Sequence, residues 1–359
     1  MNPSSIDFLL ELVEHSLDTN RDEGLTLWSN TFDRLFVHLN ISSCRRLLRL
    51  IKKSGTSSDV GKEAQILGLS AQGMLEIRLG NSNDAIACYK KALAYLQNTG
   101  NGKGTEAWLW SNLGNIHYLS GNFKDAVESY SRSMKLYQEV GDEKGMALAL
   151  SNQGNAFRDS GELEKASDCF REAFSLQQSY EEEENSAISL VNWGSVLQLR
   201  GAYDEAEEAY RQSLEVFVHL DNLHYQAQVL GNLGTLFLET NQWDAALENF
   251  LHDLEINRNV GDLLSQSQTL NNLAIVYRRK QNPDQTRSCY EESLAIKREI
   301  GDQQGELATL INYCYLLQEI GELENLHNIL TKARTLALSL NDVKQLSRIE
   351  ALEREVFLQ

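Results

Sequence analysis

Proline is nearly absent from this chain of 359 residues, which contains only Pro3 and Pro283. Because proline removes a backbone donor and interrupts helices, a chain so poor in it has little reason to break them. Long runs of β-branched residues alternating with polar ones, which would indicate strands, are also missing. The composition therefore favours an all-α protein.

The sequence also lacks any run approaching the roughly 18 apolar residues that a membrane-spanning helix needs. Acidic Asp7 stands where a targeting segment would carry basic residues. Cysteine is sparse and widely spaced, with no CxxC pair among Cys44, Cys88, Cys169, Cys289 and Cys314. We therefore expect reduced, mostly buried thiols, a cytoplasmic location and no integral membrane association.

Basic residues are outnumbered by acidic ones, 33 to 51, which gives a formal net charge of −18. An acidic chain repels nucleic acid and anionic lipid at long range, so we expect neither as a partner. The acidity either serves solubility, as is common for helical proteins, or favours a basic partner.

What the chain does contain is an internal repeat of 40 residues. One series comprises Gly114, Gly154, Gly194 and Gly234, continued by Ala274 and Cys314. A second comprises Gly121, Gly161 and Gly201, continued by Asn241, Gln281 and Gly321. Alanine recurs at Ala126, Ala166, Ala206 and Ala246, and aromatic residues recur at Tyr130, Phe170, Tyr210, Phe250 and Tyr290. Together with an earlier unit that begins near residue 61, these series predict seven repeats.

Each repeat has the pattern of two helices. Residues 106–120 carry apolar side chains at helical spacing, and Gly121 can adopt the left-handed conformation that ends a helix. A second helix is predicted over residues 123–140, and the small residues Gly114 and Ala126 allow the two helices to approach. Neither helix can bury its apolar stripe alone, so neighbouring repeats must stack.

The pattern resembles the tetratricopeptide repeat, W-x2-L-G-x2-Y…A-x3-F, in the spacing of Trp110, Leu113, Gly114, Ala126 and Tyr130. A repeat of 40 rather than 34 residues, with Gly-Asp junctions such as Gly141-Asp142, is similar to kinesin light chains and to spindle-orientation (G-protein-signalling modulator) adaptors. The resemblance implies a right-handed α-solenoid of about seven helix hairpins with helical caps.

The two ends lack the repeat markers. We expect residues 1–60 to form an N-terminal helical cap or module, residues 61–340 the solenoid, and residues 341–359 a C-terminal capping helix. Residues 44–53, CRRLLRLIKK, are basic and amphipathic. They form either a capping helix, which we favour, or a helix that contacts a partner or a membrane surface.

Asparagine recurs every 40 residues on the first helix of six repeats, at Asn112, Asn152, Asn192, Asn232, Asn272 and Asn312. Since asparagine is a mediocre helix former, six positions within helices need a reason. Each amide either bonds within the stack and holds it together, or grips the N–H and C=O groups of an extended peptide. In the families that this chain resembles, the first helices line a concave groove and an asparagine at this position contacts bound peptide.

Residues three and six positions after these asparagines share their helix face and would set specificity. The candidates are Asn115, Asn155, Tyr118, Arg158, Gln198 and Arg278, with Arg279 beside the last. An arginine in the groove can clamp a carboxylate, which would favour an acidic motif in the ligand. Alternatively, each arginine pairs with a neighbouring glutamate.

Enzyme motifs are missing: the sequence has no glycine-rich phosphate loop, no HExxH and no GxSxG. We therefore expect no catalysis, metal or cofactor. Our leading hypothesis is an adaptor that binds a protein or peptide ligand in the concave groove. The alternative is a peptide-responsive regulatory sensor, because bacterial pheromone-responsive regulators resemble this layout. In those proteins, compaction of the solenoid controls an N-terminal helical module.

Overall fold

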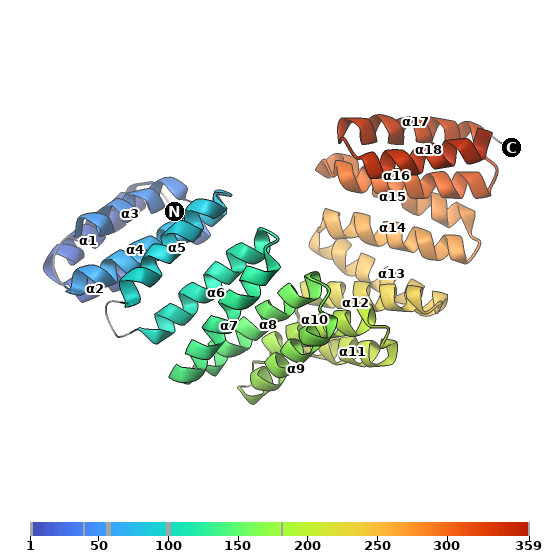
Figure 1. The fold of residues 1–359 in the computed structure, drawn as a ribbon. Coiled ribbons are helices and arrows are strands. Elements are labelled where there is room, and N and C mark those ends of the chain that lie inside the picture. The colour runs from blue at the N-terminus through green and yellow to red at the C-terminus, as the bar shows by residue number, and fades with distance from the viewer. Residues whose placement is uncertain (1–2, 39, 55–58, 98–101, 181, 358–359) are drawn as a thin grey trace. The chain divides into compact units, whose positions relative to one another are not determined.

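The computed structural model describes residues 3–38, 40–54, 59–97, 102–180 and 182–357. Every regular element in these residues is an α-helix, and successive helices run antiparallel as hairpins (Figure 1). The expected all-α solenoid of helix hairpins is therefore confirmed. The chain divides into two compact units, an N-terminal unit (Met1–Glu182) and a C-terminal unit (Glu183–Gln359).

The N-terminal unit begins with three helices and continues with three hairpins. The first three helices are α1 (Pro3–Thr19), α2 (Arg21–Val37) and α3 (Ile41–Ser54). The hairpins are α4 (Asp59–Arg78) with α5 (Ser82–Gln97), α6 (Lys103–Leu119) with α7 (Phe123–Val140), and α8 (Glu143–Asp159) with α9 (Leu163–Ser179).

The C-terminal unit contains four hairpins and a final helix. The hairpins are α10 (Glu183–Leu199) with α11 (Tyr203–His219), α12 (Leu223–Glu239) with α13 (Trp243–Val260), α14 (Leu263–Arg279) with α15 (Pro283–Ile300), and α16 (Gln303–Glu319) with α17 (Leu323–Ser339). Helix α18 (Val343–Phe357) follows. The seven hairpins, from α4–α5 to α16–α17, therefore follow the repeat that the sequence predicts.

The glycine and aromatic series meet inside the hairpins that contain both residues. A β-carbon added to Gly114 on α6 would lie 2.6 Å from the ring of Tyr130 on α7, and one added to Gly234 on α12 would lie 2.6 Å from the ring of Phe250 on α13. The glycine of the first helix therefore makes room for the aromatic ring of the second. The predicted close approach of the two helices at Gly114 is confirmed.

One residue in the turn between the two helices adopts the left-handed backbone conformation, at the positions where the sequence predicts it. Gly121 has a φ of 73°, and its equivalents Asn241 and Gln281 have φ values of 62° and 56°. The next hairpin often begins at a capping aspartate, as where the carboxylate of Asp302 accepts a hydrogen bond from the backbone N–H of Gly305 at 2.8 Å. Such caps satisfy donors that the first turn of a helix leaves free.

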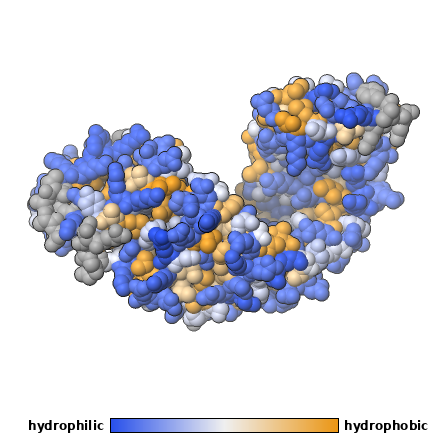
Figure 2. All heavy atoms as spheres, viewed as in Figure 1, coloured by the Kyte–Doolittle hydropathy of each residue, from blue (hydrophilic) through white to orange (hydrophobic). Residues whose placement is uncertain are grey.

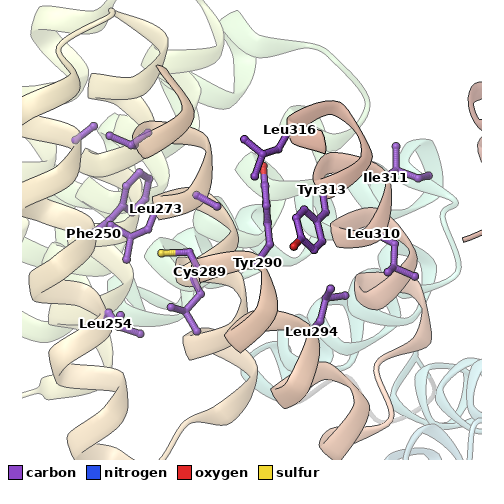
Figure 3. Packing of buried hydrophobic residues seen from close by; sticks show 14 of the residues in the cluster. Phe250, Leu254, Leu273, Cys289, Tyr290, Leu294, Leu310, Ile311, Tyr313 and Leu316 are labelled. Atoms are coloured by element: carbon purple, nitrogen blue, oxygen red, sulfur yellow. The ribbon is translucent and has the colours of Figure 1, made fainter. Parts of the chain in front are cut away.

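Stacking of hairpins buries a continuous core within the C-terminal unit. Figure 3 shows part of it, where Phe250 and Leu273 lie beside each other and the rings of Tyr290 and Tyr313 pack at a centroid distance of 5.7 Å. Each fully buried side chain of this size contributes roughly 1.5–3 kcal/mol. All five cysteines are buried and free, as expected.

Helices α1–α3 share a separate core with α4. The indole Nε1 of Trp28 donates to the backbone carbonyl of Leu47 at 2.8 Å. The apolar face of the basic segment 44–53 is turned into this core, while Arg46 and Lys53 form ion pairs with Asp7 and Glu14 on α1. The segment thus packs as a structural helix, and the role of residues 1–60 as a cap stays a prediction.

Helix α18 lies at the other end of the repeats. Ile349 and Leu352 are buried and Leu346 is half-buried, which is consistent with a capping helix over residues 341–359. The side chain of Val356, which we expected to point inward, lies outside the described residues. Among the described helices, none is long and apolar enough to cross a membrane.

Candidate peptide-binding site

The six recurring asparagines occupy equivalent places on the first helices α6, α8, α10, α12, α14 and α16, and all six are half-buried. The Nδ2 of Asn112 donates to the carbonyl of Trp108 at 2.9 Å, and the Nδ2 of Asn312 donates to the Oδ1 of Asn271 at 3.3 Å. In the described part of the chain, the amides of the other four make no hydrogen bond to protein. A structural role therefore accounts for two of the six.

The residues six positions further on mostly join neighbouring repeats. The hydroxyl of Tyr118 donates to Asp159 Oδ2 at 2.6 Å. The Nε2 of Gln198 donates to Glu239 Oε2 at 2.9 Å. In both pairs the partners lie 41 residues apart, at the ends of successive first helices. These side chains therefore form contacts within the stack, and the expectation that they also face a ligand stays a prediction.

The two arginines of this set also have carboxylate partners. The Nε of Arg158 donates to Asp159 Oδ1 at 2.8 Å, and the Nε of Arg278 donates to Glu319 Oε2 at 2.7 Å. The alternative in which each arginine pairs with a neighbouring carboxylate is therefore what the structure shows. Arg279 is exposed.

The two asparagines three positions further on differ from each other. The Oδ1 of Asn115 accepts a hydrogen bond from the hydroxyl of Tyr130 at 2.7 Å, which fixes the ring that packs on Gly114. Asn155 is half-buried. Of the residues that the sequence singled out, the structure brings Asn232 and Asn272 together in a cavity.

This cavity lies within the C-terminal unit and has a volume of about 340 Å³. Helices α12 and α14, the first helices of two successive repeats, form its walls, and α13 contributes Asp253 and Asn257. The lining residues are His224, Ala227, Gln228, Gly231, Asn232, Thr235, Asp253, Asn257, Ser265, Gln268, Thr269 and Asn272. Its wall is polar and rich in amides, which suits a ligand with several hydrogen-bonding groups.

A buried carboxylate is the charged group of this cavity. Asp253 is only 5% exposed, and it accepts hydrogen bonds from Asn257 Nδ2 and from Thr269 Oγ1, each at 2.6 Å. Burial raises the pKa of Asp253 to about 6, although these two hydrogen bonds act in the opposite direction. The carboxylate therefore titrates close to neutral pH.

Comparison with known families gives a direct result. A model of the tetratricopeptide repeat matches residues 64–139, 105–179, 185–259 and 265–339, which together make up more than half of the chain. The chain belongs to the tetratricopeptide repeat family. Among curated proteins, none matches the sequence significantly.

Solved structures with the same fold include three proteins of interest. Aspartyl phosphate phosphatase F from Bacillus subtilis has a TM-score of 0.64 at 14% identity, with 96% of each chain covered. A Rap protein complexed with competence and sporulation factor has a TM-score of 0.52 at 13% identity, with 98% of each chain covered. A kinesin light chain-type protein from Podosopora anserina, with nearly identical TPR-like repeats, has a TM-score of 0.50 at 13% identity, covering 56% of this chain and 99% of that one. At these identities the likeness shows the fold.

Sequence reasoning missed Asp253, although the tetratricopeptide repeat pattern contained a signal. The equivalent positions in other repeats hold small residues, Ser133, Ala173, Ser213, Ser293 and Ala333. Ser133 and Ser293 donate to the carbonyls of Ala107 and Ser267, at 2.7 and 2.6 Å, and so join the second helix of a hairpin to its first. The aspartate at position 253 departs from this series of small residues, and comparison of residues 40 positions apart would have revealed it.

Proposed function

We propose that this tetratricopeptide repeat protein is a non-enzymatic adaptor that binds a peptide segment of a partner protein along the first helices of its repeats. The observation that carries the proposal is the cavity between α12 and α14, which Asn232 and Asn272 line with amides that the described residues leave unbonded. An amide offers one acceptor and two donors, so it can bind the backbone of a peptide of any sequence. Recognition of an extended segment by such groups is a recurring mode of peptide binding.

The surface chemistry supports a polar mode of recognition. Figure 2 shows that hydrophilic side chains cover most of the visible described surface of each unit, with apolar side chains gathered only in small areas. A partner helix that inserts a broad apolar face would need a larger apolar patch. The other asparagines of the series, together with Asn155 and Arg279, are proposed to extend the contact along the repeats of each unit.

Binding to a random peptide library tests the proposal. Peptides selected from a phage-displayed library on the wild-type protein should bind the Asn232→Ala/Asn272→Ala variant at least tenfold more weakly. Each lost hydrogen bond is worth roughly 0.5–1.5 kcal/mol, and 1.4 kcal/mol is about tenfold in affinity. Asn259→Ala, which removes an exposed asparagine of α13, is the matched control and should bind as the wild type does. Unchanged binding by the double variant, with its helical content intact, would contradict the proposal.

A peptide-responsive sensor is the second candidate, and one observation favours it. The likeness to the Rap protein complexed with competence and sporulation factor covers 98% of this chain, and so includes α1–α3 as well as the repeats. In a sensor, peptide binding would compact the repeats and change what α1–α3 can contact. Solution scattering with the selected peptides tests this, and an unchanged radius of gyration at saturation would leave the adaptor as the better description.

The cellular location of the protein and the class of its partner are also proposals. Five buried, free thiols suit a reducing cytoplasm. The net charge of −18 makes a nucleic-acid partner unfavourable.

A further inference from the structure

We propose that the cavity around Asp253 takes the cationic side chain of a lysine or arginine in the bound peptide. The inference rests on the proposed function and names a chemical preference for it. It assigns Asp253 as the charged partner, and Asn232 and Asn272 as flanking groups that bind the adjacent peptide backbone.

The carboxylate has a charge that the cavity does not neutralise. The residues that line the cavity include no lysine and no arginine. Thr269 and Asn257 each donate one hydrogen bond to Asp253, while the two carboxylate oxygens together can accept about four. A buried carboxylate without a cation is unfavourable, and an ammonium or guanidinium group supplies both the charge and further donors.

The cavity has the size that such a group requires. Its volume of about 340 Å³ is far larger than the roughly 30 Å³ that a water molecule occupies. It also reaches the lower end of the range of about 300–1,000 Å³ in which small ligands bind. Since α12 and α14 form the walls, an extended peptide that lies across them can direct one side chain toward α13.

A second departure from the repeat pattern accompanies Asp253. Gly231 stands where other repeats have Ser111, Ser151, Val191, Asn271 and Ile311. A β-carbon at Gly231 would lie 3.3 Å from Asp253 Oδ2, so the glycine leaves the approach to the carboxylate open. Glycine within a helix lowers its stability, as does a buried carboxylate. Gly231 and Asp253 therefore both weaken the fold. A ligand that occupies the space between them explains why the two occur together.

The titratable surroundings agree with this assignment. His224 lines the cavity from α12, His252 is next to Asp253 on α13, and Asp262 precedes α14. Asp262 raises the pKa of Asp253 and His252 lowers it, both less than burial does. A bound cation would lower this pKa, so binding should release the proton that Asp253 holds at mildly acidic pH and should weaken as the pH falls below about 6.

Two synthetic hexapeptide libraries provide the test. One has lysine fixed at the third position, and the other has norleucine there, which is uncharged and similar in length. We expect the wild type to bind the lysine library at least tenfold more tightly in fluorescence anisotropy. The preference should disappear in Asp253→Asn and fall severalfold in Gly231→Ser, which keeps the carboxylate but narrows the approach to it. Glu255→Gln removes an exposed carboxylate of the same helix and should keep the full preference.

The outcomes separate this inference from the proposed function. Equal binding of the two libraries by the wild type, or a preference that survives in Asp253→Asn, overturns the cation site and leaves peptide binding intact. Binding of neither library overturns both. Asparagine fits at position 253 because the single hydroxyl hydrogen of Thr269 can turn from residue 253 to the carbonyl of Ser265, which lies 2.9 Å away. The hydroxyl oxygen can then accept a hydrogen bond from the new amide.

Discussion

Arg278 on α14 and Glu319 on α16 are 41 residues apart and bond directly, with Nε donating to Oε2 at 2.7 Å. Tyr118 and Asp159 repeat this relationship in the N-terminal unit. These contacts join the first helices of successive repeats on the face where we expected ligand-binding side chains. The position six residues after the recurring asparagine therefore contributes to stacking in these repeats, and its role in specificity stays a prediction.

Glu319→Gln should weaken the C-terminal unit by roughly 0.5 kcal/mol, the usual size for a partly exposed ion pair. The hydrogen bond from Arg278 lowers the pKa of Glu319 below its ordinary value of 4.5. A lowered pKa in the folded state contributes stability that is present above pH 4.5 and is lost as the pH falls through the folded value. Urea unfolding of wild type and variant should therefore differ at pH 7, and the difference should shrink as the pH is lowered below 4.5. Glu324→Gln, at an exposed position of α17, is the control and should show no difference at either pH.

Gly114→Ala should destabilise the N-terminal unit by about 1–3 kcal/mol, because its β-carbon would lie 2.6 Å from the Tyr130 ring. Gly104 is on the same helix, and a β-carbon there would meet no heavy atom within 4 Å. Gly104→Ala should therefore stabilise by about 0.5–1 kcal/mol through helix propensity alone. Thermal unfolding monitored by circular dichroism compares the two variants. A Gly114→Ala protein as stable as Gly104→Ala would show that the ring moves aside without cost.

The hairpins could be predicted from the sequence because a repeat makes each position visible several times. Glycine at 114, 154, 194 and 234 and an aromatic residue sixteen positions later are fixed by direct packing of one against the other. The candidate site was harder to predict because its residues do not recur from repeat to repeat. Asp253 and Gly231 each occur in one repeat only. Their significance comes from their proximity across two helices, where a β-carbon on Gly231 would lie 3.3 Å from Asp253 Oδ2, and the repeat pattern does not encode that proximity. Likewise, nothing in the sequence distinguishes Asn312, which bonds to Asn271, from Asn232.

Alanine substitution should divide the asparagine series into two groups. Asn312→Ala removes the hydrogen bond to Asn271 and should destabilise by roughly 1 kcal/mol. Asn232→Ala removes no hydrogen bond within the described residues and should be neutral or stabilise by up to about 0.5 kcal/mol, since alanine is the better helix former. Chemical unfolding of both variants measures the difference. A loss of about 1 kcal/mol in Asn232→Ala as well would indicate that the whole series holds the stack and would weaken the argument for a peptide ladder.

Asp253→Asn should make the protein more stable at neutral pH while removing its preference for cationic peptides. Burial raises the pKa of Asp253 from its ordinary value of 3.8 to about 6. In this pH range the folded state holds more protons than the unfolded state, so the stability of the wild type falls as the pH rises from about 4 to 6. One pKa unit corresponds to about 1.4 kcal/mol, which makes the cost at pH 7 roughly 2–3 kcal/mol.

The variant does not titrate at this position, so urea midpoints of the two proteins should agree near pH 4 and separate up to pH 7. If Asp253→Asn is the less stable protein at pH 7, the hydrogen bonds from Thr269 and Asn257 outweigh the burial of the charge, and Asp253 is a structural residue. If it is more stable and has lost the preference for lysine peptides, the wild type keeps a carboxylate that weakens its fold. Retention of such a residue follows from a binding site whose ligand supplies the missing cation, because occupancy stabilises the folded state by mass action.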